Sequence, residues 1–322
     1  MGTVLSVEKL STYFKTDKGI AKAVEDVSFT VNEGEMLGLI GESGCGKTTV
    51  AQSILRLIEY PGKVVKGSVH LNGKDLLKAS NSELSKLRWK DISVIPQSAM
   101  NALNPIYTIG DQIIEAILLH EDVTKKEAIK RTKNLLEMVG IDGDRWKSYP
   151  HEFSGGMKQR VAIAMALACN PKVIISDEST TGLDVLTQAQ VIALLKDLQR
   201  KMNLAVIIIS HDLPMVTAIC DRIAIMYAGK IVEWANTDQI LKDARHPYAK
   251  ALLNATPDLS DIGRKVQSIP GSVPNLVNPP KGCRFHSRCP YVMESCSQIV
   301  PELLEVSPGH YTACLLEEIR HG

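Results

Sequence analysis

Two glycine-rich stretches hold the residues of this chain best suited to bind phosphate. Residues 41–48 read Gly-Glu-Ser-Gly-Cys-Gly-Lys-Thr and match G-x-x-x-x-G-K-[ST], a loop whose backbone N–H groups cradle phosphates. We expect Lys47 to reach the β- and γ-phosphates and the Thr48 hydroxyl to hold Mg²⁺. A second stretch, Phe153–Arg160, places Ser-Gly-Gly just before a predicted helix, which suits a second phosphate contact. The ATP contacts expected in the first loop are Ser43, Gly44, Cys45, Gly46, Lys47, Thr48 and Thr49.

Polar side chains follow three predicted strands. Asp177 and Glu178 end the apolar run Val173–Ile175, so we expect Asp177 to hold Mg²⁺ and Glu178 to polarise an attacking water. Gln97 follows a strand and is expected to complete the shell of Mg²⁺ and water. His211 follows Leu204–Ile209 and is expected to donate a hydrogen bond to the γ-phosphate. The alternatives are a solvated strand end for the acidic pair and a structural role for the histidine.

The elements that must position these residues alternate between strands and helices. This order predicts an α/β fold with a largely parallel sheet. Met36–Ile40 reads as a strand feeding the glycine loop, Thr48–Ile58 as the helix after it, and a hairpin is expected around Ala228-Gly229. A helical subdomain is expected at about 98–165. The other predicted strands are Val4–Leu10, Val27–Val31, Gly67–Leu71 and Ile92–Ile95, and the other predicted helices are Ile113–Leu119, Lys126–Val139 and Val185–Met202.

The composition changes near Thr256. Pro270, Pro274, Pro279 and Pro280 break the following stretch, which predicts a boundary between residues 1–255 and a small irregular C-terminal extension at 256–322. The whole chain is otherwise ordinary for a soluble protein, with 44% apolar and 23% charged residues and a net charge of +1. No strong charge suggests nucleic acid, and neither a membrane-spanning run nor a signal segment is evident. A cytoplasmic location is the default expectation.

At this point the residues resemble a known family. The ordered set Gly41–Thr48, Gln97, Ser154–Gln159, Asp177-Glu178, Leu183-Asp184 and His211 is similar to that of an ABC-transporter ATPase subunit. The resemblance implies a P-loop nucleotide-binding domain with a parallel core, an antiparallel β subdomain and an inserted helical subdomain. Phe14 lies where the family has its adenine-stacking aromatic, or it is an ordinary apolar residue. Two subunits pair head to tail in this family, so these residues are expected to contact nucleotide held by the partner: Ser154, Gly155, Gly156, Gln159 and Asp184.

A finer resemblance is to the ATPase of dipeptide and oligopeptide importers. It rests on Gly41–Gly44, Leu103-Asn104-Pro105, His246-Pro247-Tyr248 with Ala251-Leu252, and the tail Gly282–Tyr291. It implies a peripheral subunit on the cytoplasmic face of the membrane. The implied partners are a second ATPase subunit, usually a distinct paralogue, two permease subunits and an extracellular binding protein. Uptake of oligosaccharides or nickel, and a soluble ATPase outside transport, are the alternatives.

Four residues, at three places in the chain, depart from the family pattern. Ser179 stands where Pro usually follows the catalytic Glu, Gly182 replaces a common Ala or Ser, and Ser98-Ala99 follows Gln97 in place of Asp-Pro. No departure removes a chemical group, so ATP hydrolysis is expected to survive. The change after Gln97 is expected to affect docking to the membrane partner.

Seven cysteines are present, and four of them lie near the C-terminus. Cys283, Cys289, Cys296 and Cys314 have the spacing C-x5-C-x6-C-x17-C, which suggests a site of four thiolates but matches neither usual zinc fingers nor ferredoxins. The importer resemblance implies a 4Fe–4S cluster on these residues, with Zn²⁺ or free cysteines as the alternatives. Cys45 lies at a helix N-terminus, which can lower a thiol pKa. It reads as a tolerated residue of the loop, and it is also expected to react with thiol reagents when nucleotide is absent.

Overall fold

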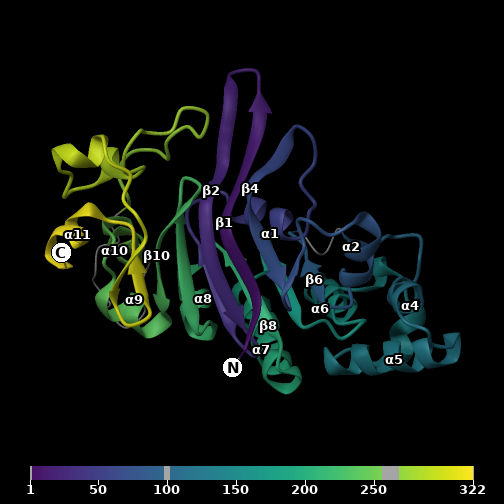
Figure 1. Ribbon diagram of the computed structural model, residues 1–322. Helices are drawn as coiled ribbons and strands as arrows, with labels where there is room; N and C mark the ends of the chain where they lie inside the picture. The colour runs from purple at the N-terminus through teal and green to yellow at the C-terminus, as the bar shows by residue number, and fades with distance from the viewer. Residues whose placement is uncertain (1, 98–101, 256–267, 322) are drawn as a thin grey trace. The chain divides into compact units, whose positions relative to one another are not determined.

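The computed structural model describes residues 2–97, 102–255 and 268–321, and these form two compact units (Figure 1). One unit is centred on Leu71–Ile208 and includes Val31–Met36. The other contains Ser6–Thr30, Leu37–His70 and the residues from Ile209 onward. Within the described ranges, no helix is both long and apolar enough to span a bilayer. The residues Ser98-Ala99, expected to affect docking, lie outside the described ranges.

The unit centred on Leu71–Ile208 has parallel strands at its core. β6 (Ile92–Ile95) runs parallel to β7 (Val173–Asp177), with Ile92 opposite Val173. β8 (Ala205–Ser210) follows β7 in the strand order. β7 and β8 are buried along their whole length, as expected for parallel strands with apolar side chains on both faces.

Helices of this unit begin at side chains that cap them. Thr108 accepts a hydrogen bond from the N–H of Asp111 at the start of α4, and Thr124 forms a capping box with Glu127 at the start of α5. α4, α5 and α6 pack on one another, and Figure 1 shows α4 and α5 close together. Besides the strands given above, the elements of this unit are β5 (Lys74–Asp75), α2 (Asn81–Leu87), α4 (Ile109–His120), α5 (Lys125–Met138), η1 (Gly143–Lys147), η2 (Pro150–Glu152), α6 (Gly155–Ala166) and α7 (Val185–Met202).

The second unit contains the glycine loop and two groups of strands. β1 (Thr3–Thr16) and β2 (Gly19–Asn32) form a long hairpin, and β4 (Gly62–Leu71) lies on the other side of β1 (Figure 1). In the other group, β3 (Met36–Ile40) pairs in parallel with β9 (Arg222–Tyr227). The strand expected before the glycine loop is therefore confirmed.

The chain reverses between β9 and β10 (Lys230–Asn236) through Ala228 and Gly229, whose φ angles are +46° and +86°. Positive φ at both central residues is what a tight type I′ turn requires, so the predicted hairpin is confirmed. The predicted helix Thr48–Ile58 is shorter than expected. α1 spans Lys47–Ile54, because Arg56 takes a left-handed φ of +52° that ends the helical path.

The C-terminal segment adds strands to this unit, whereas the composition predicted only irregular structure. β12 (His310–Thr312) pairs antiparallel with β10, and β11 (Leu304–Ser307) pairs with β12. The proline-rich composition concealed these strands because each has only three or four residues. The remaining elements are α8 (Leu213–Ile219), α9 (Thr237–Asp243), α10 (Pro247–Asn254), η3 (His286–Arg288), η4 (Glu294–Ser297) and α11 (Leu315–His321).

A buried carboxylate ties these C-terminal elements together. Glu233 on β10 is fully buried and accepts hydrogen bonds from the N–H groups of Arg245 and His246, both at 2.7 Å. Its Oε1 also lies 2.6 Å from His310 Nε2 on β12. A buried carboxylate with three partners is satisfied, so Glu233 joins β10, the start of α10 and the C-terminal hairpin.

Candidate nucleotide-binding and catalytic site

The glycine loop connects β3 to α1, the strand–loop–helix context that the sequence pattern requires. Gly44 and Gly46 have φ of +77° and +106°, and a Cβ on Gly46 would lie 2.2 Å from the carbonyl oxygen of Ala23. Only glycine fits this close approach. Gly46 also caps α1 without a side-chain hydrogen bond, and the N-terminus of a helix that no side chain caps suits an anion.

Lys47 lies within the loop that it is expected to serve. Its Nζ donates to the carbonyl oxygens of Gly41 at 2.8 Å and Glu42 at 3.2 Å, and its side chain is buried. Ser43 and Gly44 are exposed, while Thr48 and Thr49 are half-buried on α1. The ammonium group of Lys47 is thus hydrogen-bonded to the backbone of its own loop. An incoming phosphate would have to replace those contacts with the carbonyl oxygens.

The expectation of a reactive Cys45 is wrong. Cys45 is fully buried, and burial raises the pKa of its thiol despite the nearby charge of Lys47. Desolvation of the thiolate outweighs the helix terminus and the lysine. We therefore treat Cys45 as a small buried residue of the loop.

Two aromatic residues lie near the end of β1. Phe14 is half-buried, and a Cβ on Gly62 would lie 2.5 Å from its ring, so it packs against the start of β4. Its neighbour Tyr13 donates a hydrogen bond from its hydroxyl to Glu25 at 3.0 Å. The hydroxyl of Tyr13 is thus committed to the protein, whereas the ring of Phe14 has no polar group to anchor it.

In the unit centred on Leu71–Ile208, the structure brings together Gln97 and Glu178. The Nε2 atom of Gln97 donates to Oε2 of Glu178 at 3.1 Å. Asp177 is buried at the end of β7, and Glu178 after it has a left-handed φ of +43°. A non-glycine residue in this region is strained and is found often at functional sites. This left-handed backbone conformation turns the chain away from the direction of β7 at Glu178.

The departure at Ser179 has a structural role. Its Oγ lies 2.6 Å from Oγ of Ser176, a buried residue of β7, so the two hydroxyls share a hydrogen bond. This bond holds the turn after Glu178 where a proline would do so by its ring. Gly182 has a φ of +86°, a conformation that alanine or serine adopts only with strain.

The second glycine-rich stretch, Phe153–Arg160, contains the start of α6. Ser154 is exposed and caps the helix by accepting a bond from the N–H of Met157 at 3.4 Å. Gly156 faces α7, where a Cβ would lie 2.4 Å from Cγ2 of Thr187. Gln159 is buried, and its Nε2 lacks a hydrogen-bond partner among the described residues.

Asp184 caps α7, the helix that Gly156 of the second glycine-rich stretch faces. Its carboxylate accepts from the N–H of Thr187 at 2.9 Å and from the Thr187 hydroxyl at 2.6 Å. Hydrogen bonds from this threonine lower the pKa of Asp184, so it is charged at neutral pH. Thr187 therefore joins Asp184 to Gly156 within this unit.

His211 lies in the other unit, directly after β8, and its side chain is exposed. The next residue, Asp212, caps α8 by accepting from the N–H of Met215 at 3.1 Å. The cap fixes the backbone on the C-terminal side of His211. His211 therefore stays a predicted γ-phosphate contact.

The four C-terminal cysteines line one small cavity, together with Phe285, Met293 and Leu315. Burial raises the pKa of Cys283 to about 11, and burial also raises those of Cys289 and Cys314. Across the described ranges, no group of three or more His, Cys, Asp or Glu side chains forms a site for a metal ion. A metal-binding role for the extension is thus left as a proposal.

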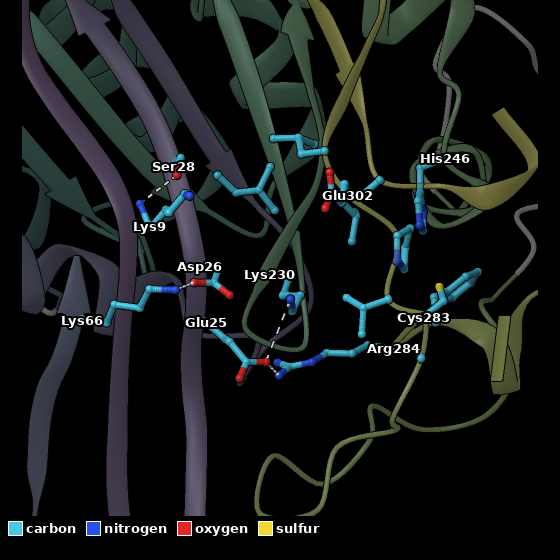
Figure 2. A pocket seen from close by; sticks show the side chains of 18 residues that line it. Lys9, Glu25, Asp26, Ser28, Lys66, Lys230, His246, Cys283, Arg284 and Glu302 are labelled. Atoms are coloured by element: carbon cyan, nitrogen blue, oxygen red, sulfur yellow. Dashed lines mark hydrogen bonds and ion pairs between the residues drawn. The ribbon is translucent and has the colours of Figure 1, made fainter. Parts of the chain in front are cut away.

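No motif in the sequence marked Arg284, the arginine that anchors this cysteine-bearing segment. Arg284 donates to the carbonyl oxygen of Ala228 and to Glu25 on β2. Figure 2 shows this pair at the side of a cavity of about 470 Å³, with Lys230 also close to Glu25. Burial works against ionisation of Glu25, but hydrogen bonds from Lys22 and the charge of Arg284 lower its pKa. No local spacing could reveal this pair, because its members lie 259 positions apart.

Comparisons with known proteins agree with this geometry. A family model described as ABC transporter matches residues 24–181, and one described as the oligopeptide/dipeptide transporter C-terminal region matches residues 232–296. A dipeptide transport ATP-binding protein of Bacillus subtilis is 45% identical over 99% of this chain and 96% of its own length. An oligopeptide transport ATP-binding protein of Escherichia coli is also 45% identical, over 97% and 92%.

Solved structures resemble the ATPase part. A dimeric bacterial ABC transporter cassette superposes with a TM-score of 0.65 at 27% identity, covering 72% of this chain and 98% of the cassette. The same cassette has been solved in a post-hydrolysis state with ADP and phosphate, with the same TM-score. A cassette from Clostridium perfringens that is part of an ABC transporter complex gives 0.66 at 26% identity, over 76% of this chain and 92% of its own.

Proposed function

This chain belongs to the ABC transporter family, among the ATP-binding subunits of peptide transporters, and we propose from this premise that it hydrolyses ATP to drive peptide uptake. The likeness runs along the whole chain and includes the C-terminal region characteristic of oligopeptide and dipeptide transporters. That coverage carries the proposal, because the ATPase part alone occurs with many cargoes. Di- and oligopeptides are the proposed cargo, and oligosaccharides or nickel are the outcomes that would replace them.

The proposed chemistry assigns each site residue a task. Backbone N–H groups of the loop and Lys47 bind the phosphates, and Phe14 stacks on the adenine. Thr48, Gln97 and Asp177 would hold Mg²⁺, which would supply positive charge to the phosphate oxygens. Glu178 takes a proton from the attacking water, whose oxygen bonds to the γ-phosphorus while the bond to ADP breaks. His211 donates a hydrogen bond to the γ-phosphate.

The same proposal pairs this chain with a second ATPase subunit. Ser154, Gly155, Gly156, Gln159 and Asp184 would act on nucleotide held by that partner. The exposure of Ser154 supports this, because its hydroxyl can meet another chain. The full assembly would place this subunit at the cytoplasmic face of the membrane, with a paralogous ATPase, two permease subunits and an extracellular binding protein.

Reconstitution tests the transport proposal. The chain would be co-expressed with its ATPase and permease partners, placed in vesicles, and supplied with ATP and binding protein loaded with tri- and pentapeptides. We expect ATP hydrolysis and peptide entry to rise together, and both to be lost in Glu178→Gln. Stimulation by oligosaccharide or nickel instead of peptide would overturn the cargo. A rate of ATP hydrolysis that is the same with and without the permease subunits would favour a soluble ATPase.

We also propose that the four C-terminal thiols hold a 4Fe–4S cluster. The support is that Cys283, Cys289, Cys296 and Cys314 line one cavity with apolar walls. A cluster that binds four thiolates is larger than a single ion, so it tolerates thiols that do not converge on one point. When bound, it would crosslink a segment that has little core of its own.

Metal analysis tests this cofactor. Protein purified without oxygen would be assayed for iron, acid-labile sulfide and zinc, with a visible absorption spectrum. About four irons and four sulfides per chain are expected, falling sharply in Cys289→Ser and unchanged in the control Cys220→Ala. Cys220 is a buried cysteine far from this cavity in the sequence. Zinc without sulfide would replace the cluster with a zinc site, and no metal would overturn the proposal.

A further inference from the structure

The C-terminal segment reaches the glycine loop through one arginine. Arg288 donates from Nη1 to Oε2 of Glu42 at 2.7 Å and from Nη2 to Oε1 of Glu42 at 3.0 Å. These two parallel bonds form the bidentate arrangement that is strongest between arginine and carboxylate. Glu42 is the second residue of the loop, and Arg288 lies 246 positions later, directly before Cys289. Both residues belong to the same compact unit.

The surroundings of Arg288 fit a guanidinium and no other group. Nε donates to the carbonyl oxygen of Pro270 at 2.8 Å, Nη1 also to the Tyr227 hydroxyl at 3.2 Å, and Nη2 also to the carbonyl oxygen of Ile269 at 3.2 Å. All five N–H donors therefore have an acceptor. The side chain of Arg288 is 5% exposed, compared with 24% for Glu42. A lysine cannot satisfy this planar set of acceptors.

Glu42 is also held at its backbone. Its N–H donates to the hydroxyl of Tyr248 on α10 at 2.9 Å, and its carbonyl oxygen accepts from Nζ of Lys47 at 3.2 Å. Tyr248 packs against Tyr227 and Phe285, with ring centroids 4.6 and 5.4 Å away. Glu42, whose carbonyl oxygen contacts Lys47, is thus held by Arg288 and by an aromatic cluster. The cysteine-bearing segment supplies Arg288 and the Phe285 ring of that cluster.

We propose that Arg288 is a positioning residue for ATP binding, which fixes and neutralises Glu42 so that the glycine loop is shaped to receive phosphates. The inference rests on the ATPase function of the chain. Without Arg288, the carboxylate of Glu42 would be left uncompensated in the loop that must accept several phosphate charges. Like charges held in one loop repel, most strongly where water is partly excluded. The C-terminal segment therefore sets the affinity of the loop for nucleotide.

Equilibrium binding of Mg·ATP to the purified full-length chain tests this role. We expect Arg288→Ala to weaken ATP binding at least about tenfold, from loss of a charge-assisted bidentate pair. Arg288→Lys should recover the binding only in part. In a double-mutant cycle, Arg288→Ala should have little further effect once Glu42→Gln has removed the carboxylate.

A matched control separates positioning from folding. Arg245→Gln removes another arginine that anchors the C-terminal segment, through Glu317, but has no contact with the glycine loop in the described structure. We expect it to lower the melting temperature and leave the Kd for ATP within twofold of the unaltered chain. The iron and zinc content of Arg288→Ala should match that of the unaltered chain, so that a change at Cys289 does not explain the result.

Two results would overturn the inference alone. One is an unchanged Kd for ATP in a folded Arg288→Ala variant, and the other is full additivity of Arg288→Ala and Glu42→Gln. Failure of the unaltered chain to bind ATP would instead overturn the ATPase function on which the inference rests.

Discussion

The side-chain amide of Gln97 donates a hydrogen bond to the carboxylate of Glu178 across 3.1 Å. The two residues follow neighbouring parallel strands, β6 and β7, and lie 81 positions apart in the chain. The bond orients Glu178, whose backbone is already turned by a left-handed φ. A residue expected to organise Mg²⁺ is thus linked to the residue expected to activate water.

Glu178→Gln should abolish ATP hydrolysis while ATP binding persists. The amide cannot accept a proton from water, and loss of a general base typically costs about 10²- to 10⁴-fold in rate. The measurements are kcat in the assembled transporter and the Kd for Mg·ATP. Glu115→Gln, which changes an exposed carboxylate on α4, is the control and should leave both unchanged. Hydrolysis within tenfold of normal in Glu178→Gln would rule out Glu178 as the base.

Gly156→Ala should destabilise the protein because its new methyl would meet Cγ2 of Thr187 at 2.4 Å. Overpacking of this kind costs about 1–3 kcal/mol. Thr187→Ser removes the opposing methyl but keeps the hydroxyl that bonds Asp184. We therefore expect the double variant Gly156→Ala/Thr187→Ser to recover part of the loss, as measured by urea unfolding. Equal stability of the two Gly156→Ala variants would contradict this packing.

Phe14→Ala should weaken ATP binding without a large change in kcat. Stacking of a base on an aromatic ring contributes about 1–3 kcal/mol, so the Kd should rise roughly 5- to 150-fold. Tyr13→Phe is the matched control, since it removes only the hydroxyl that bonds Glu25. If Tyr13→Ala weakens ATP binding and Phe14→Ala does not, the stacking role belongs to Tyr13.

Acid should destabilise the fold through His246. This residue is fully buried at the start of α10, where its Nδ1 accepts from the N–H of Tyr248 at 3.0 Å. Burial lowers the pKa of His246 to about 3, against about 6.5 in the unfolded chain. Between these values the unfolded chain binds a proton that the folded chain does not, so stability falls as the pH falls.

The corresponding measurement compares urea unfolding of the unaltered chain and His246→Asn from pH 7.5 to pH 5. Asparagine keeps an acceptor for the helix cap and does not titrate. The unaltered chain should lose about 2 kcal/mol more than the variant over this range, as linkage requires for one proton. Parallel pH profiles would show that the pKa of His246 is the same in the folded and unfolded chains, against this prediction.

Local patterns of residues were enough to predict the chemistry of this protein. The spacing of Gly41–Thr48 compels a loop between strand and helix, since only glycines permit its backbone angles and its close approach to Ala23. Apolar runs likewise predicted the buried strands β7 and β8, because a strand covered on both faces has no polar alternation. The family resemblance, carried by the same residues, is confirmed by relatives that match along the whole chain.

The contacts between residues far apart in the chain could be read from the fold alone. The sequence offered Cys45 both as an ordinary loop residue and as a thiol open to reagents, and burial, which raises the pKa of the thiol, decides for the ordinary residue. It marked Glu42 and the tail around Cys289 as separate signs of the family, whereas the fold joins them through Arg288. Local patterns report periodicity and backbone preference, which act over a few residues. Desolvation and ion pairing depend on which segments the fold packs together, and no local pattern records that.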